Sequence, residues 1–134
     1  MIGVTVCPYC NRSYIFTSNK RGTRPQYDHY FPKSKYPYLA LSMHNLIPCC
    51  AVCNGLKHDE DTYETPFIYP YKDSYGEQVT FEENGVNADN IESWLGAARE
   101  YEIKIRYADE IDGVLKSKIE HAATTFRLEE LYSK

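Results

Sequence analysis

The sequence predicts an α+β protein made of a small N-terminal domain, residues 1–60, and an α+β extension, residues 61–134. Two observations separate the parts. All five cysteines lie within the first 53 residues. Residues 1–58 carry seven basic residues and one acidic residue, a net charge of +6, whereas residues 59–134 carry eight basic and eighteen acidic residues, a net charge of −10. A third observation, short segments typical of strands and helices in both parts, indicates the α+β class.

In the N-terminal part we expect two short strands, at Asn11–Thr17 and Thr23–Tyr30, because both are rich in β-branched and aromatic residues. Ser18–Gly22 between them has the composition of a turn, so the two strands are predicted to form a hairpin. One helical turn is expected at Tyr38–Ser42. A short helix is expected at Cys50–Lys57, which contains no proline.

In the extension, Thr65–Tyr71 is punctuated by proline and is expected to be extended. Gln78–Glu82 and Tyr101–Tyr107 alternate apolar with polar residues, which predicts strands. Asp89–Leu95 is expected to be a short helix capped by its first residue. Val114–Tyr132 has apolar residues at helical spacing and predicts one amphipathic helix.

Composition and charge limit the class of protein. The chain has 134 residues, of which 43% are hydrophobic and 25% charged, as in ordinary soluble domains. No apolar run approaches the roughly 20 residues that span a bilayer, and the N-terminus lacks a signal-peptide pattern. We therefore expect a soluble, cytoplasmic protein. The positive charge of residues 1–58 favours a polyanionic partner, such as nucleic acid, for that part.

The cysteines form two Cys-x-x-Cys pairs, Cys7 with Cys10 and Cys50 with Cys53. Two such pairs supply the four thiolates of a tetrahedral structural zinc site. Buried free thiols or a redox pair are the alternatives, but redox chemistry needs one pair only and no thioredoxin-like pattern surrounds either. Cys49 with Cys53 is a possible but worse pair, so Cys49 is expected to be a packed or semi-exposed thiol.

Between the pairs lie Asp28-His29 and Asn45, and Asn54 follows the last cysteine with Lys57 three residues later. This order, over residues 7–58, resembles the HNH endonuclease family. The resemblance implies a small ββα-metal, treble-clef-like domain stapled by zinc. It is closest to bacterial HNH proteins with an Asp-His-x-x-Pro-x-Ser segment, some of which are linked to phage defence. Such proteins usually continue beyond a helix like Leu128–Tyr132, so we expect a piece of a longer polypeptide.

The resemblance also implies an activity: metal-dependent hydrolysis of phosphodiester bonds in nucleic acid, with DNA the expected substrate. His29 would be the general base, while Asp28 and Asn54 would hold Mg²⁺ or another divalent cation. Asn45 would fix the loop over the hairpin and so orient His29. The family often has histidine where this chain has Asn54. His58, expected four residues later on the same helical face, is therefore a further candidate ligand.

This chemistry agrees with the residue types. Phosphodiester hydrolysis needs a proton acceptor for water and a cation beside the phosphate oxygens. A histidine titrates in the required range, and hard divalent cations prefer carboxylate and amide oxygens. Because Asp28 and His29 are adjacent on a predicted strand, their side chains point to opposite faces. A neighbouring loop must bring both to one cleft.

Other residues of the basic half have weaker assignments. Five cations are candidate phosphate contacts: Arg12, Arg24, Lys33, Lys35 and Lys57. Four tyrosines are expected to build the small core rather than to stack on bases: Tyr27, Tyr30, Tyr36 and Tyr38.

Two other functions remain open. One is a non-catalytic zinc module that binds nucleic acid or protein. The other is an adaptor whose acidic extension binds a partner protein and whose HNH half is vestigial. The oligomeric state, the choice between DNA and RNA, and the sequence specificity stay open as well.

Overall fold

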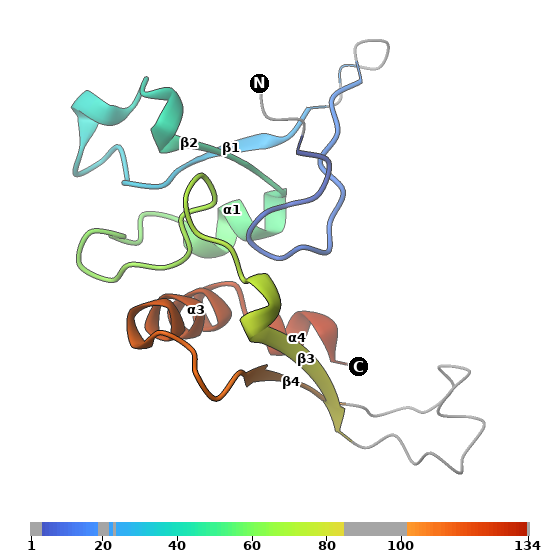
Figure 1. Cartoon of the computed structure of the whole chain (residues 1–134). Coiled ribbons are helices and arrows are strands. Elements are labelled where there is room, and N and C mark those ends of the chain that lie inside the picture. The colour runs from blue at the N-terminus through green and yellow to red at the C-terminus, as the bar shows by residue number, and fades with distance from the viewer. Residues whose placement is uncertain (1–3, 19–21, 23, 85–101, 134) are drawn as a thin grey trace.

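The computed structural model describes residues 4–18, 22, 24–84 and 102–133 (Figure 1). Its strands are β1 (Gln26–His29), β2 (Leu46–Cys49), β3 (Val79–Asn84) and β4 (Glu102–Tyr107). Its α-helices are α1 (Ala51–Lys57), α3 (Gly113–Thr125) and α4 (Leu128–Tyr132). Short 3-10 helices lie at Pro37–Leu39, Met43–Asn45 and Gly76–Gln78. These helices and two separate antiparallel sheets confirm the α+β class.

The first sheet pairs β1 with β2, with Tyr27 opposite Pro48 and His29 opposite Leu46. The predicted hairpin between residues 11–17 and 23–30 is therefore wrong in its pairing. In the described part of residues 11–17, Tyr14 forms an isolated bridge with Val6, which closes the turn that carries the first cysteine pair. The strand expected around Asp28 exists, but its partner comes from a segment that contains a proline, as edge strands tolerate.

Helix α1 follows β2 directly and begins at the second cysteine pair. The Cys50 sulfur caps it by accepting a hydrogen bond of 3.4 Å from the Cys53 backbone N–H. The helix ends at Lys57, because His58 takes a positive φ of 47°. The helix predicted for Cys50–Lys57 is confirmed. His58, however, lies beyond its end and not on its face, so the expected helical spacing from Asn54 does not hold.

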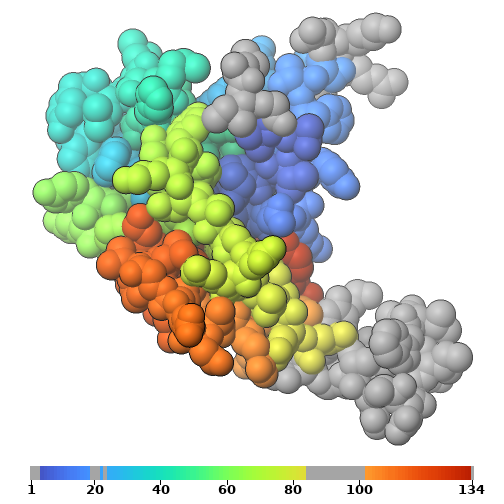
Figure 2. Space-filling view, in the orientation of Figure 1, coloured from blue at the N-terminus to red at the C-terminus, as the bar shows by residue number. Residues whose placement is uncertain are grey.

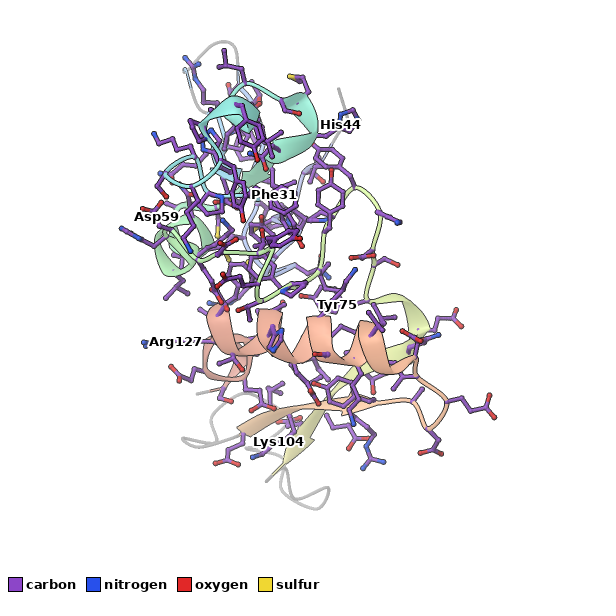
Figure 3. All side chains as sticks on the ribbon, turned by 90° about the vertical axis from the view of Figure 1, so that its left-hand side faces the viewer. Phe31, His44, Asp59, Tyr75, Lys104 and Arg127 are labelled. Atoms are coloured by element: carbon purple, nitrogen blue, oxygen red, sulfur yellow. The ribbon has the colours of Figure 1, made fainter. Side chains whose placement is uncertain are left out.

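The extension has both predicted strands, β3 and β4, paired along their length. The single helix predicted for residues 114–132 is wrong, because the chain breaks after α3. Arg127 adopts a left-handed conformation with φ of 48° and starts α4 in a new direction (Figure 3). This break buries Phe126 and Leu128, at 0% and 2% exposure, although they flank the turn. The helix predicted at Asp89–Leu95 lies outside the described residues.

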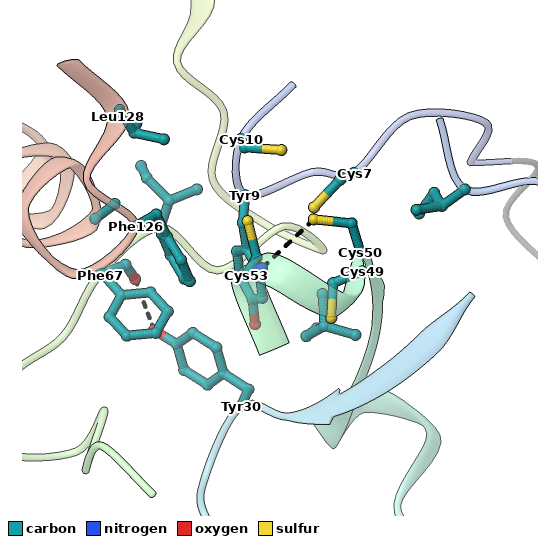
Figure 4. Packing of buried hydrophobic residues seen from close by; sticks show 14 of the residues in the cluster. Cys7, Tyr9, Cys10, Tyr30, Cys49, Cys50, Cys53, Phe67, Phe126 and Leu128 are labelled. Carbon is teal, nitrogen blue, oxygen red and sulfur yellow. Dashed lines mark hydrogen bonds between the residues drawn. The ribbon is translucent and has the colours of Figure 1, made fainter. Parts of the chain in front are cut away.

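One hydrophobic core joins the two parts of the chain. The Tyr9 ring stacks on Phe126 with centroids 4.5 Å apart, and Phe67 meets both rings edge-on (Figure 4). Tyr30 adds another edge contact to Phe67 and donates a hydrogen bond of 2.7 Å to its carbonyl oxygen. In Figure 2 the segment after α1 lies between the N-terminal part and α3. The extension therefore packs against the N-terminal part through these aromatic side chains.

Among the described residues, the longest helix is α3 with 13 residues, and none of the helices is both long and apolar enough to cross a membrane.

Candidate metal centre and active site

The four paired cysteines converge in the structure. The sulfur atoms of Cys7, Cys10, Cys50 and Cys53 all lie within 4.8 Å of one another, and all four residues are buried. The backbone N–H of Cys53 donates a hydrogen bond to the Cys50 sulfur within this cluster. Four sulfur donors in two such turns match the ligand set of structural zinc. The cluster therefore suggests a structural zinc site, as the spacing predicts.

The crowded thiols of this cluster do not ionise independently. Hydrogen bonds from the thiols of Cys53 and Cys7 hold the pKa of Cys10 far below its usual range. The hydrogen bond with Cys10 raises the pKa of Cys7 to about 11. A divalent cation at the centre would remove this competition, because it stabilises all four thiolates together.

Cys49 stands apart from the cluster, although it is adjacent to Cys50. It is fully buried in β2, opposite Gln26, and burial raises the pKa of its thiol. It is thus a packed thiol, one of the two states predicted for it.

Asp28 lies at the centre of a buried polar network. Its carboxylate oxygens accept hydrogen bonds of 2.7 Å from the Tyr9 hydroxyl and of 3.1 Å from the Lys57 ammonium. Lys57 also donates to the backbone oxygen of His29 at 2.7 Å, and its side chain is 0% exposed. A phosphate cannot reach this ammonium, so the prediction that Lys57 contacts nucleic acid is wrong. In the sequence Lys57 looks like any surface lysine, so its buried ion pair with Asp28 was not predicted.

His29 is half-buried at the end of β1, and its ring is held by one contact. Nε2 lies 3.0 Å from the carbonyl oxygen of Ala40. A carbonyl oxygen only accepts hydrogen bonds, so Nε2 carries the proton in the neutral ring. The lone pair is then on Nδ1, the atom that remains to accept a proton.

Asn45 ties together the backbone segments on either side of this contact. Its Oδ1 accepts from the Phe31 N–H at 2.7 Å, and its Nδ2 donates to the carbonyl oxygens of Phe31 and Leu39 at 3.0 and 3.3 Å. Phe31 follows His29 by two residues, and Leu39 precedes Ala40. Asn45 is 3% exposed, so these bonds are protected from water.

A surface depression of about 290 Å³ gathers most of the predicted catalytic residues. It lies beside β1 and α1, which with the segments that follow them supply its lining. Its lining residues are Tyr27, Asp28, His29, Pro32, Lys33, Asn54, His58 and Asp59. Asp28 and His29 both line this depression, although they alternate on the strand and the Asp28 side chain is only 4% exposed. The sequence analysis expects a neighbouring loop to form one cleft with Asp28 and His29. In the structure, the turn after α1 lines the depression beside them.

The other ligand candidates reach the depression in different ways. The Asn54 amide nitrogen donates to the Gln26 side chain at 2.8 Å, which assigns its Nδ2 and leaves its Oδ1 as the candidate ligand atom. Asp59, which the sequence interpretation missed, lies in the turn after α1 (Figure 3). Its position directly after His58 was the available signal. Asn45 does not line the depression and acts at a distance from it.

The predicted phosphate contacts are spread over the surface. Lys33 is exposed on the rim of the depression, whereas Lys35 pairs with Asp61 at 3.0 Å. Arg12 and Arg24 are exposed away from the rim. The core prediction for the tyrosines holds for Tyr30 and is wrong for two others. Tyr27 and Tyr38 are 50% and 77% exposed.

Comparison with known proteins agrees with this arrangement. Residues 7–60 match the family model described as HNH endonuclease. The chain is 40% identical over 47 residues to the Septu protein PtuB of Bacillus thuringiensis, a match covering 35% of this chain and 18% of that protein. It thus spans less than a fifth of that relative's length. No solved structure matches the chain significantly. The match to the HNH endonuclease family model is thus confined to residues 7–60, the part of the chain that contains the cysteine cluster and the depression.

Proposed function

We propose that the protein is a metal-dependent endonuclease that hydrolyses phosphodiester bonds in nucleic acid, with DNA as the substrate. One observation carries the proposal: the Nε2 atom of His29 is bound to the Ala40 carbonyl oxygen. This contact selects the tautomer whose Nδ1 accepts a proton and fixes the direction of the ring. A general base needs both properties.

In the proposed reaction, His29 removes a proton from a water molecule as the water oxygen attacks the phosphorus atom. The P–O bond to one sugar oxygen breaks at the same time, and this oxygen leaves and takes a proton from the solvent. Asn45 is the positioning residue, because it holds the backbone on both sides of the His29–Ala40 contact. Lys33 and, farther from the depression, Arg12, Arg24 and Lys35 would contact phosphates of the bound strand. Such contacts fix position and carry no sequence information.

The candidate ligands of the divalent cation are Asp28 and Asn54, with His58 and Asp59 beside them in the same depression. Oxygen donors of this kind suit Mg²⁺. A carboxylate has about four acceptor positions, so Asp28 retains acceptor capacity beside its bonds to Tyr9 and Lys57. The bound cation would stabilise the negative charge that develops on the phosphate oxygens.

The buried ion pair between Lys57 and Asp28 favours a second candidate function. Lys57 already compensates the charge of Asp28, 3.1 Å away, without any added cation. A non-catalytic zinc module that binds nucleic acid or protein would keep this pair for stability alone. The proposed nuclease is preferred because the His29 tautomer and the depression have no purpose in such a module.

The organisation around the site is part of the proposal. Residues 1–60 would form the nuclease domain, and residues 61–134 an extension that supports it and offers a surface for a protein partner. The similarity to a Septu protein supports a role in defence against phage.

The test is cleavage of supercoiled plasmid in Mg²⁺ or Mn²⁺ by the wild-type chain and by His29→Ala and Asn54→Ala. We expect nicking by the wild type, almost none with His29→Ala, and a higher Mg²⁺ requirement with Asn54→Ala. Equal cleavage by the wild type and His29→Ala would refute the assignment of the base. Binding of DNA without cleavage in either metal would favour the zinc module.

A further inference from the structure

The face of the first sheet that carries His29 also carries an exposed aromatic ring. Side chains alternate along a strand, so Tyr27 and His29 share one face, about 7 Å apart. Their partners on β2 are Pro48 and Leu46. Tyr27 is 50% exposed, although it lies in the middle of a strand. The apolar surface of the sheet therefore begins directly beside the proposed general base.

This surface is hollowed. A second depression, of about 280 Å³, has a lining that includes Ile15, Pro25, Tyr27, Met43, Leu46 and Tyr71. None of the described residues that line it is charged. Tyr27 also lines the depression that contains His29, so the two depressions share this residue.

Two further apolar side chains are exposed at this second depression. Met43 is 72% exposed and Tyr71 36% exposed. The Tyr71 ring is fixed by a hydrogen bond of 2.7 Å from its hydroxyl to the Leu46 carbonyl oxygen and by an edge contact with His44. Rigid aromatic walls around a space of this size suit one flat ring, because typical small-molecule sites are larger, about 300–1,000 Å³.

We propose that this second depression binds an unpaired nucleobase, stacked on Tyr27, of the nucleotide next to the phosphate that is cleaved. The inference rests on the nuclease function proposed above and deepens it. A base that enters the depression cannot be stacked in a duplex. The preferred substrate is therefore nucleic acid that is single-stranded, or locally unpaired, at the cleavage position.

The surroundings favour a nucleobase over an apolar side chain of a protein partner. The depression shares Tyr27 with the proposed catalytic depression, where a phosphate must lie for His29 to act. Two exposed cations are close to these depressions: Lys33 lines the catalytic one, and Arg24 directly precedes Pro25, which lines the apolar one. Alternation of aromatic rings with basic side chains is the usual means of holding single strands.

The experiment measures binding to His29→Ala protein, so that cleavage does not interfere. The probes are a single-stranded oligodeoxynucleotide that carries the fluorescent base 2-aminopurine and the duplex of the same sequence. We expect tighter binding to the single strand and quenching of the probe by stacking. Tyr27→Ala should weaken single-strand binding about 5- to 150-fold, the equivalent of losing about 1–3 kcal/mol of stacking per base.

Two further variants and a control make the result specific. Tyr27→Phe keeps a ring and should restore both affinity and quenching. Met43→Glu, on an exposed wall, should weaken single-strand binding by charge repulsion without disturbing the core. The control is Tyr63→Ala, which removes a tyrosine that is 73% exposed and lines neither depression. It should bind as the parent does.

The inference is overturned if Tyr27→Ala binds the single strand as tightly as Tyr63→Ala, or if the duplex binds at least as well as the single strand. Failure to bind any single strand also overturns it and points to an apolar protein partner. These outcomes are distinct from failure of the nuclease. If single-strand binding depends on Tyr27 but the wild-type protein cleaves no nucleic acid in Mg²⁺ or Mn²⁺, the base site is retained and the endonuclease is refuted.

Discussion

The Tyr9 hydroxyl donates a hydrogen bond of 2.7 Å to the Asp28 carboxylate. Tyr9 lies between Cys7 and Cys10, so the first turn of the cysteine cluster is bonded directly to the strand that ends in His29. Lys57, at the end of α1, holds the other carboxylate oxygen. Asp28 therefore connects the cysteine cluster, β1 and α1, and a disturbance of the cluster is transmitted to the proposed active site.

Removing this hydroxyl should destabilise the fold measurably. Tyr9→Phe keeps the ring stacked on Phe126 but deletes a bond to a buried charge, which should lower the free energy of unfolding by about 1.5–3 kcal/mol. Tyr132→Phe, which deletes a bond to the neutral Cys10 carbonyl oxygen, is the control and should cost about 0.5–1.5 kcal/mol. Urea unfolding measures both. Equal losses in the free energy of unfolding would show that the bond to Asp28 stabilises the fold no more than the bond to the Cys10 carbonyl oxygen.

Loss of the metal should unfold the N-terminal part. Cys53→Ser removes one of four converging sulfurs and should abolish zinc binding, because a closed four-thiolate site contributes much of the folding energy of a small domain. Cys49→Ala, in a residue that is equally buried but outside the cluster, should retain one zinc per chain. Elemental analysis and circular dichroism test both variants. A wild-type protein purified without chelator and containing no zinc would contradict the assignment.

The sequence predicts the cysteine cluster well, because each Cys-x-x-Cys pair is local and its geometry depends on a single tight turn. It also predicts α1 and the strands β3 and β4, whose patterns are continuous. The pairing of β1 was missed because its partner, β2, is 17 residues farther on and contains Pro48, which weakens a strand signal.

Burial of polar groups was harder to predict than secondary structure. The position of Lys57 depends on Asp28, 29 residues earlier, and no local pattern encodes such a pair.

The break between α3 and α4 at Arg127 also depends on tertiary contacts and not on a local pattern. Phe126 and Leu128 are both buried, which one continuous helix does not predict from the periodicity of residues 114–132. Tertiary packing overrides the helical preference here.

Stability at acidic pH should depend on Asp73. Burial alone would raise the pKa of this carboxyl, but hydrogen bonds from the Lys118 ammonium, at 2.7 Å, and the Tyr69 N–H lower it below its usual value. A lowered pKa stabilises the fold at pH values above that of the unfolded carboxyl, about 3.9, and this contribution is lost as the pH falls through the folded value.

Asp73→Asn should therefore be less stable than the wild type at pH 7, and the difference should shrink below about pH 4. Urea unfolding between pH 2.5 and pH 7 measures this difference. Asp109→Asn, an exposed carboxyl in the same extension, serves as control. A difference for Asp73→Asn that stays constant over the whole range would show that the ion pair does not contribute through its charge.

Nucleic acid should bind the basic half, at the rim of the catalytic depression. Lys33→Glu should weaken binding to all sequences about equally and reduce its dependence on salt concentration, because a phosphate contact releases counterions. Lys116→Glu, the same change on α3, should have little effect. Binding to His29→Ala protein at several salt concentrations measures both. A larger loss with Lys116→Glu would place the nucleic acid on the extension instead.

His29 is expected to act in the chemical step and not in folding. The most direct measurement is the single-turnover rate of DNA cleavage in Mg²⁺ for the wild type, for His29→Ala, and for His121→Ala, a histidine on α3 that lines neither depression. We predict that His29→Ala keeps its zinc and thermal stability but loses about 10²–10⁴-fold in rate, as expected for a missing general base, while His121→Ala cleaves like the wild type. Cleavage by folded His29→Ala at the wild-type rate would contradict the account.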